Sequence, residues 1–148
     1  MSTARQRAHA TRARLRALTF DAVERRLRPH VAAAVDRARE GLRHIPDGPA
    51  AQAAQAAQHA VDTAAAMLAR RATAAACHGA RLRAIRAEAT LAHGPTPASP
   101  RTIAALRAAM WAATAAWCLR GSGPHPTPAS AECAVSEALR EASIARTA

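Results

Sequence analysis

The sequence is poor in the large side chains that build a protein core. It has no tyrosine, one phenylalanine and two tryptophans, and it also lacks lysine and asparagine. Leucine, isoleucine, valine and phenylalanine together supply only 20 of the 148 residues, a low share of the kind that warns of disorder. Alanine, with 46 residues, offsets this warning because it is the best helix former, although it buries little area. We therefore expect an all-α protein with a thin core.

Cysteine is also scarce, and its placement argues against a structural role. Cys77, Cys118 and Cys133 stand far apart with no CxxC pair, which excludes a disulfide framework. The seven histidines show no zinc-finger, HExxH or di-iron spacing. One alternative is a metal site that Cys77, His78, Cys118 and Cys133 would form across helices. The prediction is that the protein holds no metal and no cofactor.

Catalytic and membrane signals are missing as well. The sequence has no GxSxG, Walker A or GxGxxG motif and no carboxylate pair away from arginine, so it is not expected to be an enzyme. The basic N-terminus is not followed by the apolar segment of a secretory signal. Residues 102–119 carry a single charge, Arg107, but the stretch is short and alanine is barely apolar on insertion scales. We expect a cytoplasmic protein without membrane contact.

Arginine is the residue type in excess. All 21 basic residues are arginine, against 10 acids, giving a net charge of +11 and a pI near 11.7. Such a balance suggests a polyanionic partner. The alternative is codon usage, because arginine and alanine codons are rich in G and C. The sequence leaves both interpretations open.

The spacing of apolar residues predicts an antiparallel helical bundle of four main helices. Their approximate ranges are 20–44, 50–93, 100–120 and 128–146. Segments rich in proline and glycine separate them, and such short connections place neighbouring helices antiparallel. A basic N-terminal extension, residues 1–19, precedes a single helical domain of residues 20–148.

Several residues predict where the helices begin and end. Thr19 and Ser99 suit the N-cap position, and Pro49 and Pro100 suit the first helical residue. Gly121 is the expected C-cap of the third main helix.

Two of the predicted helices carry a regular stripe of apolar residues. Helix 20–44 carries an apolar stripe at steps of three and four residues, and Pro29 is expected to kink or break it. The stripe residues are Phe20, Val23, Leu27, Val31, Ala34, Ala38 and Leu42. Helix 100–120 has the most regular stripe, ending at Trp117, which we expect to be a principal core residue.

The stretch from Pro49 to Gly94 is expected to organise the chain. It has no internal proline and is about half alanine, and as one helix it would be roughly 65 Å long at about 1.5 Å per residue. Val61, Leu68 and Leu82 would share its buried face. A bend or a close helix crossing is expected at Cys77–Gly79. Because no other helix could cover its length, its bare faces would favour a dimer.

One short motif has a known counterpart. Ser99–Arg107 reads SPRTIAALR and resembles the start of a helix-turn-helix recognition helix, which implies DNA reading by that helix. However, the preceding segment His93–Pro97 contains two prolines, where that motif requires a tight turn after a short helix.

The N-terminal arginines form the candidate binding site. Residues 1–28 contain Asp21 and Glu24 as their only acids. Guanidinium groups on one continuous face would favour a polyanion, and scattered ones a solvated extension. The candidate nucleic-acid-binding residues are Arg5, Arg7, Arg12, Arg14, Arg16, Arg25, Arg26 and Arg28.

Three functions follow from these observations. The first is a non-catalytic helical interaction module that self-associates or docks on another helical protein. The second is a nucleic-acid-binding protein that uses the arginine-rich N-terminus without sequence preference. The third is a helical protein that binds a small molecule.

Overall fold

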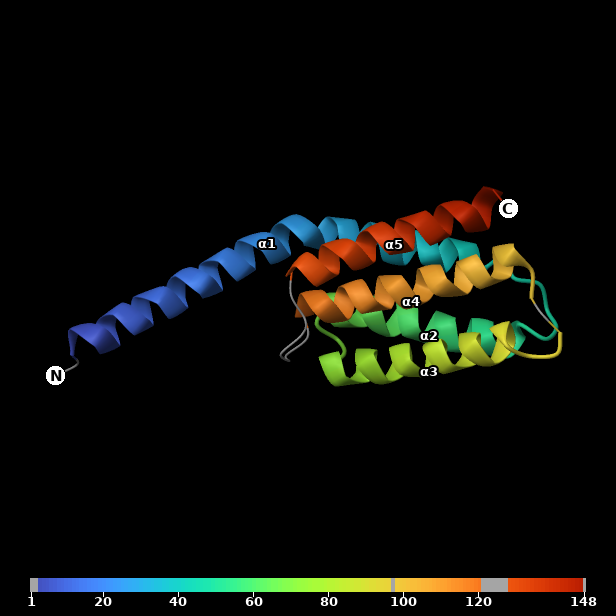
Figure 1. The fold of residues 1–148 in the computed structure, drawn as a ribbon, viewed down its shortest axis with the longest axis horizontal. Coiled ribbons are helices and arrows are strands. Elements are labelled where there is room, and N and C mark those ends of the chain that lie inside the picture. Colours follow the sequence, from blue (N-terminus) through green and yellow to red (C-terminus); the bar gives the residue numbers. More distant parts are fainter. Residues whose placement is uncertain (1–2, 97, 121–127, 148) are drawn as a thin grey trace.

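The chain folds entirely into helices over the residues that the structure describes. A computed structural model describes residues 3–96, 98–120 and 128–147, apart from the side chains of residues 16–21, 128 and 129. Within these ranges there is no strand, which confirms the all-α prediction. The helices are α1 (Ala4–Leu42), α2 (Ala51–Leu68), α3 (Ala74–Ala92), α4 (Pro100–Arg120) and α5 (Pro128–Thr147). Successive helices run in opposite directions (Figure 1).

α1 is longer than expected and begins at the N-terminus of the chain. Thr3 and Gln6 form a reciprocal capping box, in which the backbone N–H of Gln6 donates to Thr3 Oγ1 at 3.2 Å and the Thr3 N–H donates to Gln6 Oε1 at 2.8 Å. Such a box satisfies two backbone N–H groups that a helix start leaves unpaired. The prediction of an N-cap at Thr19 is therefore wrong, because α1 continues through it. α1 also continues through Pro29, so the helix does not break there, and of the two predicted forms only a kink remains. The N-terminal half of α1 projects from the bundle as an isolated helix (Figure 1).

The expected long helix of residues 50–93 is two helices. α2 ends at Leu68 and α3 begins at Ala74. The chain reverses between them, so α3 packs back on α2. The prediction of one continuous helix was wrong because alanine-rich stretches stabilise helix locally without covering any face. Folding back buries the alanine faces of both halves, which one straight helix would leave exposed to water.

Local hydrogen bonds define this unpredicted turn. The Arg71 N–H bonds the Ala66 carbonyl at 2.7 Å, the 6→1 bond of a Schellman-type helix end. Arg70 adopts a left-handed φ of 61°, a position usually filled by glycine. On the other side, Thr73 Oγ1 accepts the Ala76 N–H at 3.1 Å and caps α3.

The break changes which residues of α3 are buried. They are Cys77, Ala80, Ala84 and Glu88, whereas Leu82 is 38% exposed, contrary to prediction. The prediction of a close helix crossing at Cys77–Gly79 has a mixed outcome. Cys77 Sγ lies 3.7 Å from the Ala113 carbonyl of α4, whereas a Cβ at Gly79 would meet nothing within 4 Å. α3 continues through both residues without a break.

α4 takes the central place that the sequence assigned to residues 49–94. It contacts α1, α2, α3 and α5, and more than half of its 21 residues are buried. This packing leaves only part of the α4 surface facing solvent, including Arg101 and Trp111. α4 is also long and apolar enough by composition to cross a membrane, but 67% of that window is buried inside the bundle.

The remaining cap predictions have mixed outcomes. Ser99 caps α4, and its Oγ accepts the Thr102 N–H at 3.2 Å, as predicted. Pro49 is not the first residue of α2, which begins at Ala51 after an N-cap, Ala50, that makes no side-chain hydrogen bond. Gly121 lies outside the described residues.

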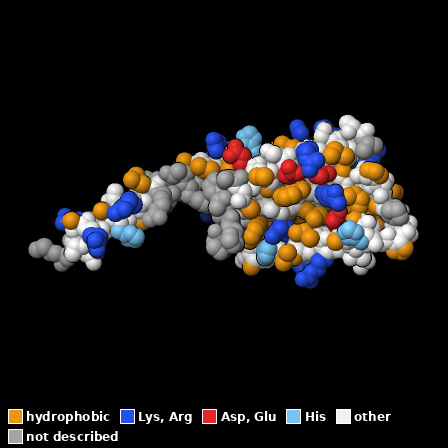
Figure 2. Space-filling model, in the orientation of Figure 1, with side chains coloured by type: hydrophobic (Ala, Val, Ile, Leu, Met, Phe, Trp, Pro, Cys, Tyr) orange, Lys and Arg blue, Asp and Glu red, His pale blue; other side chains and the backbone are white. Residues whose placement is uncertain are grey.

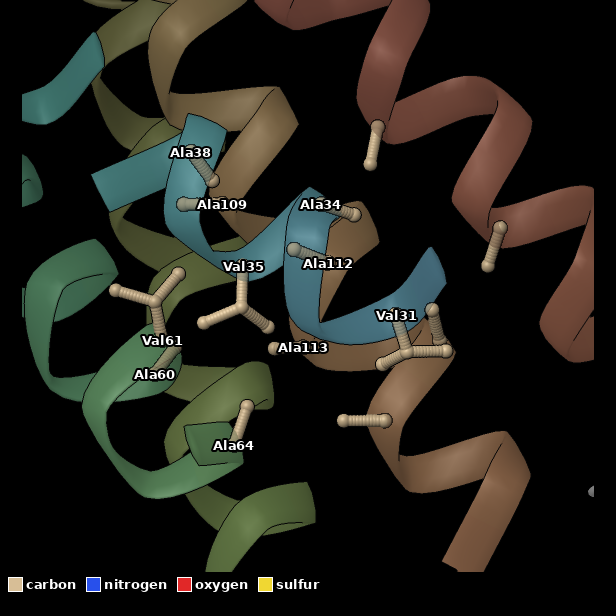
Figure 3. Close-up of a cluster of buried hydrophobic side chains, with 14 of the residues drawn as sticks. Val31, Ala34, Val35, Ala38, Ala60, Val61, Ala64, Ala109, Ala112 and Ala113 are labelled. Atoms are coloured by element: carbon tan, nitrogen blue, oxygen red, sulfur yellow. The ribbon is translucent and has the colours of Figure 1, made fainter. Parts of the chain in front are cut away.

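The core is built largely from alanine, with a few branched side chains between helices. Val35 of α1 lies between Val61 of α2 and Ala113 of α4, and Val31 lies beside α4 (Figure 3). Both valines are at most 2% exposed. Leu27, Ala34, Ala38 and Leu42 are buried too, so the predicted stripe of α1 is confirmed for these residues. Alanine lets helix axes approach closely but contributes little buried area per residue.

Trp117 lies at the edge of the core. It packs against the core cluster but is only partly buried. The His78 ring stacks on it at a centroid distance of 4.5 Å, and the Arg81 guanidinium lies 4.8 Å from the indole centroid. The expectation that Trp117 is a principal core residue is therefore corrected: Leu106 and Leu119 are the largest fully buried side chains.

Candidate nucleic-acid interface

The projecting part of α1 is a basic helix exposed on all sides. Every residue from 3 to 15 is exposed, and this segment contains no acid. Arg5, Arg7, Arg12 and Arg14 belong to it, and no described carboxylate forms an ion pair with any of them. Figure 2 shows these basic side chains along the arm without an acidic one beside them. We call residues 3–15 the arm.

The arginines of the arm do not share one face. Residues seven apart lie on the same side of an α-helix, so Arg5 and Arg12 form one row, and Arg7 and Arg14 form another. Residues two apart differ by about 200° around the axis, so the two rows flank opposite sides. The single continuous basic face is therefore absent, and the arm is basic on two opposite flanks. By the criterion stated from the sequence, this arrangement favours a solvated extension, and only a ligand that reaches both flanks at once would contact all four arginines.

The two surfaces between the rows carry different side chains. On one of them, Leu15, which is 58% exposed, joins the small residues Ala4, Ala8 and Thr11 at helical spacing. Gln6 and His9 lie on the other. The Thr11 hydroxyl donates to the Arg7 carbonyl at 3.0 Å. The Gln6 side chain accepts the Thr3 N–H at 2.8 Å, so it is engaged in the cap. The arm thus offers charge and a narrow surface but few groups for reading base edges.

The other candidate residues divide into three cases. Arg16 lies in α1, but its side chain is outside the description. Arg25 and Arg26 are exposed where α1 joins the bundle. Arg28 is half-buried, and its guanidinium donates to the Leu68 carbonyl at the end of α2, so its observed contact is with the bundle. Sequence reasoning missed that contact because nothing local marks the end of α2.

Ion pairs between helices hold the body that carries the arm. Arg120 Nε of α4 lies 2.6 Å from a Glu24 carboxylate oxygen of α1. Arg39 of α1 pairs with Asp62 of α2 at 2.9 Å. Glu24 is thereby engaged on the bundle and is not available to neutralise the arm.

A second polar cluster lies between α3 and α4. Arg81 donates to Thr114 Oγ1 at 3.3 Å and lies 3.1 Å from His78 Nδ1. Burial raises the pKa of the Cys77 thiol to about 11, and the Arg81 charge partly opposes this shift. Burial also raises the pKa of Cys118, while Cys133 is exposed. Such thiols are poorly suited to nucleophilic chemistry at neutral pH.

The metal site considered from the sequence is not assembled. Across the described residues, no group of three or more histidine, cysteine, aspartate or glutamate side chains is placed to hold a metal ion. Cys133 is exposed on α5, whereas Cys77 and Cys118 are buried.

Comparison with family models, curated proteins and solved structures gives no match to this chain.

Proposed function

We propose that the protein is a non-catalytic nucleic-acid-binding protein whose arm binds duplexes without sequence preference. The observation that carries the proposal is the helix itself: a capped basic segment extends from a folded bundle without packing on it (Figure 1). Four exposed arginines and no acid make it strongly attractive to phosphate. Guanidinium groups bind phosphate well because their planar donors match two oxygens.

The two-row arrangement suits a groove better than a flat surface. The major groove of B-DNA is roughly 12 Å wide and admits one α-helix. A helix lying in it has a phosphate backbone on each side, where the rows Arg5/Arg12 and Arg7/Arg14 would lie. The small side chains of Ala4 and Ala8 allow close approach. Base contacts would specify sequence, and the arm has few side chains to make them.

The alternative of a self-associating or docking module has less support. Its reason was the uncovered faces of a long helix, and the α2–α3 turn removes that helix. Like charge would also oppose pairing of two arms. Self-association therefore stays a prediction, to be checked by sedimentation of the full chain.

The test is a salt titration of binding to a 20-base-pair duplex. Each phosphate contact contributes about −0.9 to the slope of log affinity against log salt. The variant R5Q/R7Q/R12Q/R14Q should therefore flatten the slope by about 3.6. The matched control R70Q/R71Q/R83Q/R86Q removes the same charge from exposed positions on the bundle. It should change the slope by less than about 1.

Two further variants test the groove geometry. R5Q/R12Q and R7Q/R14Q each remove one row, and both should flatten the slope by about 1.8. If only one row mattered, the arm would lie on a surface rather than in a groove. Equal loss in the arm and bundle variants would show that binding follows net charge alone and would refute the proposal.

A further inference from the structure

A cavity of about 490 Å³ opens at the end of the bundle opposite the arm. It lies between the C-terminal parts of α1 and α5 and the N-terminus of α4, at the end marked by the C-terminus in Figure 1. This volume is within the range of roughly 300–1,000 Å³ typical of small-molecule sites. We call it the end cavity.

The end cavity combines apolar and cationic walls. Ile45, Ala105, Ala142 and Ala145 supply apolar surface, and the last three belong to buried parts of α4 and α5. Three arginines from three helices also line it: Arg37 of α1, Arg101 of α4 and Arg146 of α5. Residues so distant in sequence meet only because α1, α4 and α5 pack together.

The three arginines carry charge that the protein itself does not neutralise. In the described part of the chain, none of Arg37, Arg101 and Arg146 has an ion pair. Glu40 is the one carboxylate lining the cavity, and it already pairs with Arg43 at 3.0 Å and His44 at 3.4 Å. The walls therefore attract an anion.

The start of α4 adds hydrogen-bonding groups to the same wall. Ser99 and Thr102 line the cavity, and their hydroxyls are joined by a hydrogen bond of 3.1 Å. The positive end of the α4 dipole favours negative charge. Few backbone donors remain for a ligand there, because Pro100 has no N–H and the Thr102 N–H is bonded to Ser99 Oγ. Arg101 stands in that turn, so its guanidinium and the helix end act on the same region.

A second large cavity provides a contrast. It measures about 590 Å³ and lies between α2 and α3, with Arg83 and Arg86 among its lining residues. Two arginines from one helix line it, whereas the end cavity has three from three helices. It therefore serves as a control site.

We propose that the end cavity binds a small organic phosphate, with the phosphate at the arginines and the organic body on the alanine wall. A phosphate monoester carries a charge of about −1.5 to −2 at pH 7. It can therefore neutralise several guanidinium groups, whereas a ligand with one carboxylate carries a single negative charge. The proposal concerns a separate site from the arm and does not depend on nucleic-acid binding.

Isothermal titration of the full chain with phenyl phosphate tests the proposal. Inorganic phosphate supplies the charge without the organic body, and phenol supplies the body without the charge. Phenyl phosphate should bind at least about tenfold more tightly than either, because only it uses both walls. The variant R101Q/R146Q should weaken phenyl phosphate at least about tenfold by removing two charge-assisted contacts. The control R83Q/R86Q, with the same net charge, should stay within about twofold.

The location is checked by the isoleucine methyl resonances. Of the four isoleucines, Ile45 lines the end cavity, and Ile85 and Ile103 line neither cavity. Phenyl phosphate should shift the Ile45 methyl and leave those of Ile85 and Ile103 in place. No binding at millimolar concentration would overturn the proposal, as would equal binding by R101Q/R146Q and the parent. Equal weakening by R101Q/R146Q and R83Q/R86Q would also overturn it, since that result reflects net charge only.

Discussion

Arg107 Nε of α4 donates a hydrogen bond of 3.0 Å to a carboxylate oxygen of Glu88 on α3. The two partners differ in environment: the Glu88 side chain is 10% exposed and that of Arg107 is 48% exposed. Glu88 is thus a buried acid in a helix whose other buried residues are Cys77 and two alanines. The pair joins α3 to α4. The stability that the protein loses when the pair is broken should depend on which partner is replaced.

The first prediction is that the two single substitutions of this pair lower the stability by different amounts. R107Q leaves a nearly buried carboxylate without its cation and should lower the free energy of unfolding by about 2–3 kcal/mol. E88Q leaves a half-exposed guanidinium that water can solvate, and it should cost about 1 kcal/mol or less. Urea unfolding of the parent, both single variants and the double variant measures the coupling. Equal costs for the two single variants would contradict the asymmetry.

The second prediction is a loss of stability between pH 9 and about 11. Burial raises the pKa of Cys77 from 9.0 to about 11 in the folded protein. Over that window the unfolded chain releases the thiol proton while the folded chain keeps it. Stability is therefore fully present below pH 9 and falls as the pH rises, by an amount on the order of 2 kcal/mol. Urea unfolding at pH 8.5 and pH 10.5 measures the difference.

The composition limits the number of side chains that titrate between pH 9 and about 11. The sequence has no lysine and no tyrosine, the two other side chains that ordinarily titrate in this range. C77A should reduce the pH dependence, and C77A/C118A should reduce it further, because burial raises the pKa of both thiols. The same slope in C77A and the parent would assign the effect to another group.

The sequence predicted the buried face of α1 well and the course of residues 50–93 poorly. Leu27, Val31 and Leu42 stand out in α1 because large apolar side chains alternate with charged ones. Between Ala51 and Ala92, 19 of the 42 positions are alanine, which favours helix equally on a buried and an exposed face. The turn at Arg70 has neither glycine nor proline, so only tertiary packing decides where the helix stops.

The candidate sites show the same limit. The charge of the arm is evident from Arg5 to Arg14, because local sequence has no acid there. The end cavity was not predictable, since Arg37, Arg101 and Arg146 lie on three separate helices. Arg28 counted as part of the arm by sequence, whereas its contact is with the end of α2.

The third prediction separates Arg28 from its neighbour Arg26. R28Q removes a charged donor from the Leu68 carbonyl in a half-buried position and should lower the free energy of unfolding by about 1–2 kcal/mol. Arg26 is exposed, so R26Q should change it by less than about 0.5 kcal/mol. Thermal unfolding of the two variants, which carry the same net charge, makes the comparison. A stable R28Q protein would mean that the Leu68 carbonyl is satisfied without this arginine.

The fourth prediction concerns the backbone of the turn between α2 and α3. Arg70 is the one non-glycine residue with positive φ in the described chain, at 61°. The left-handed conformation costs an L-residue about 1–2 kcal/mol. Glycine avoids this cost but loses about 0.5–1 kcal/mol through greater freedom in the unfolded chain. R70G should therefore stabilise the protein by about 0.5–1 kcal/mol, which raises the thermal midpoint by about 2 °C in a chain of this size.

Two controls isolate the backbone term in that prediction. R70Q removes the same charge but keeps a Cβ, so it should leave the midpoint near that of the parent. A69G introduces glycine at the preceding residue, where φ is −85° and no strain exists to relieve. It should destabilise the protein by about 0.5–1 kcal/mol. If R70G and R70Q raised the midpoint equally, the gain would come from charge, and the turn would not depend on the left-handed conformation of Arg70.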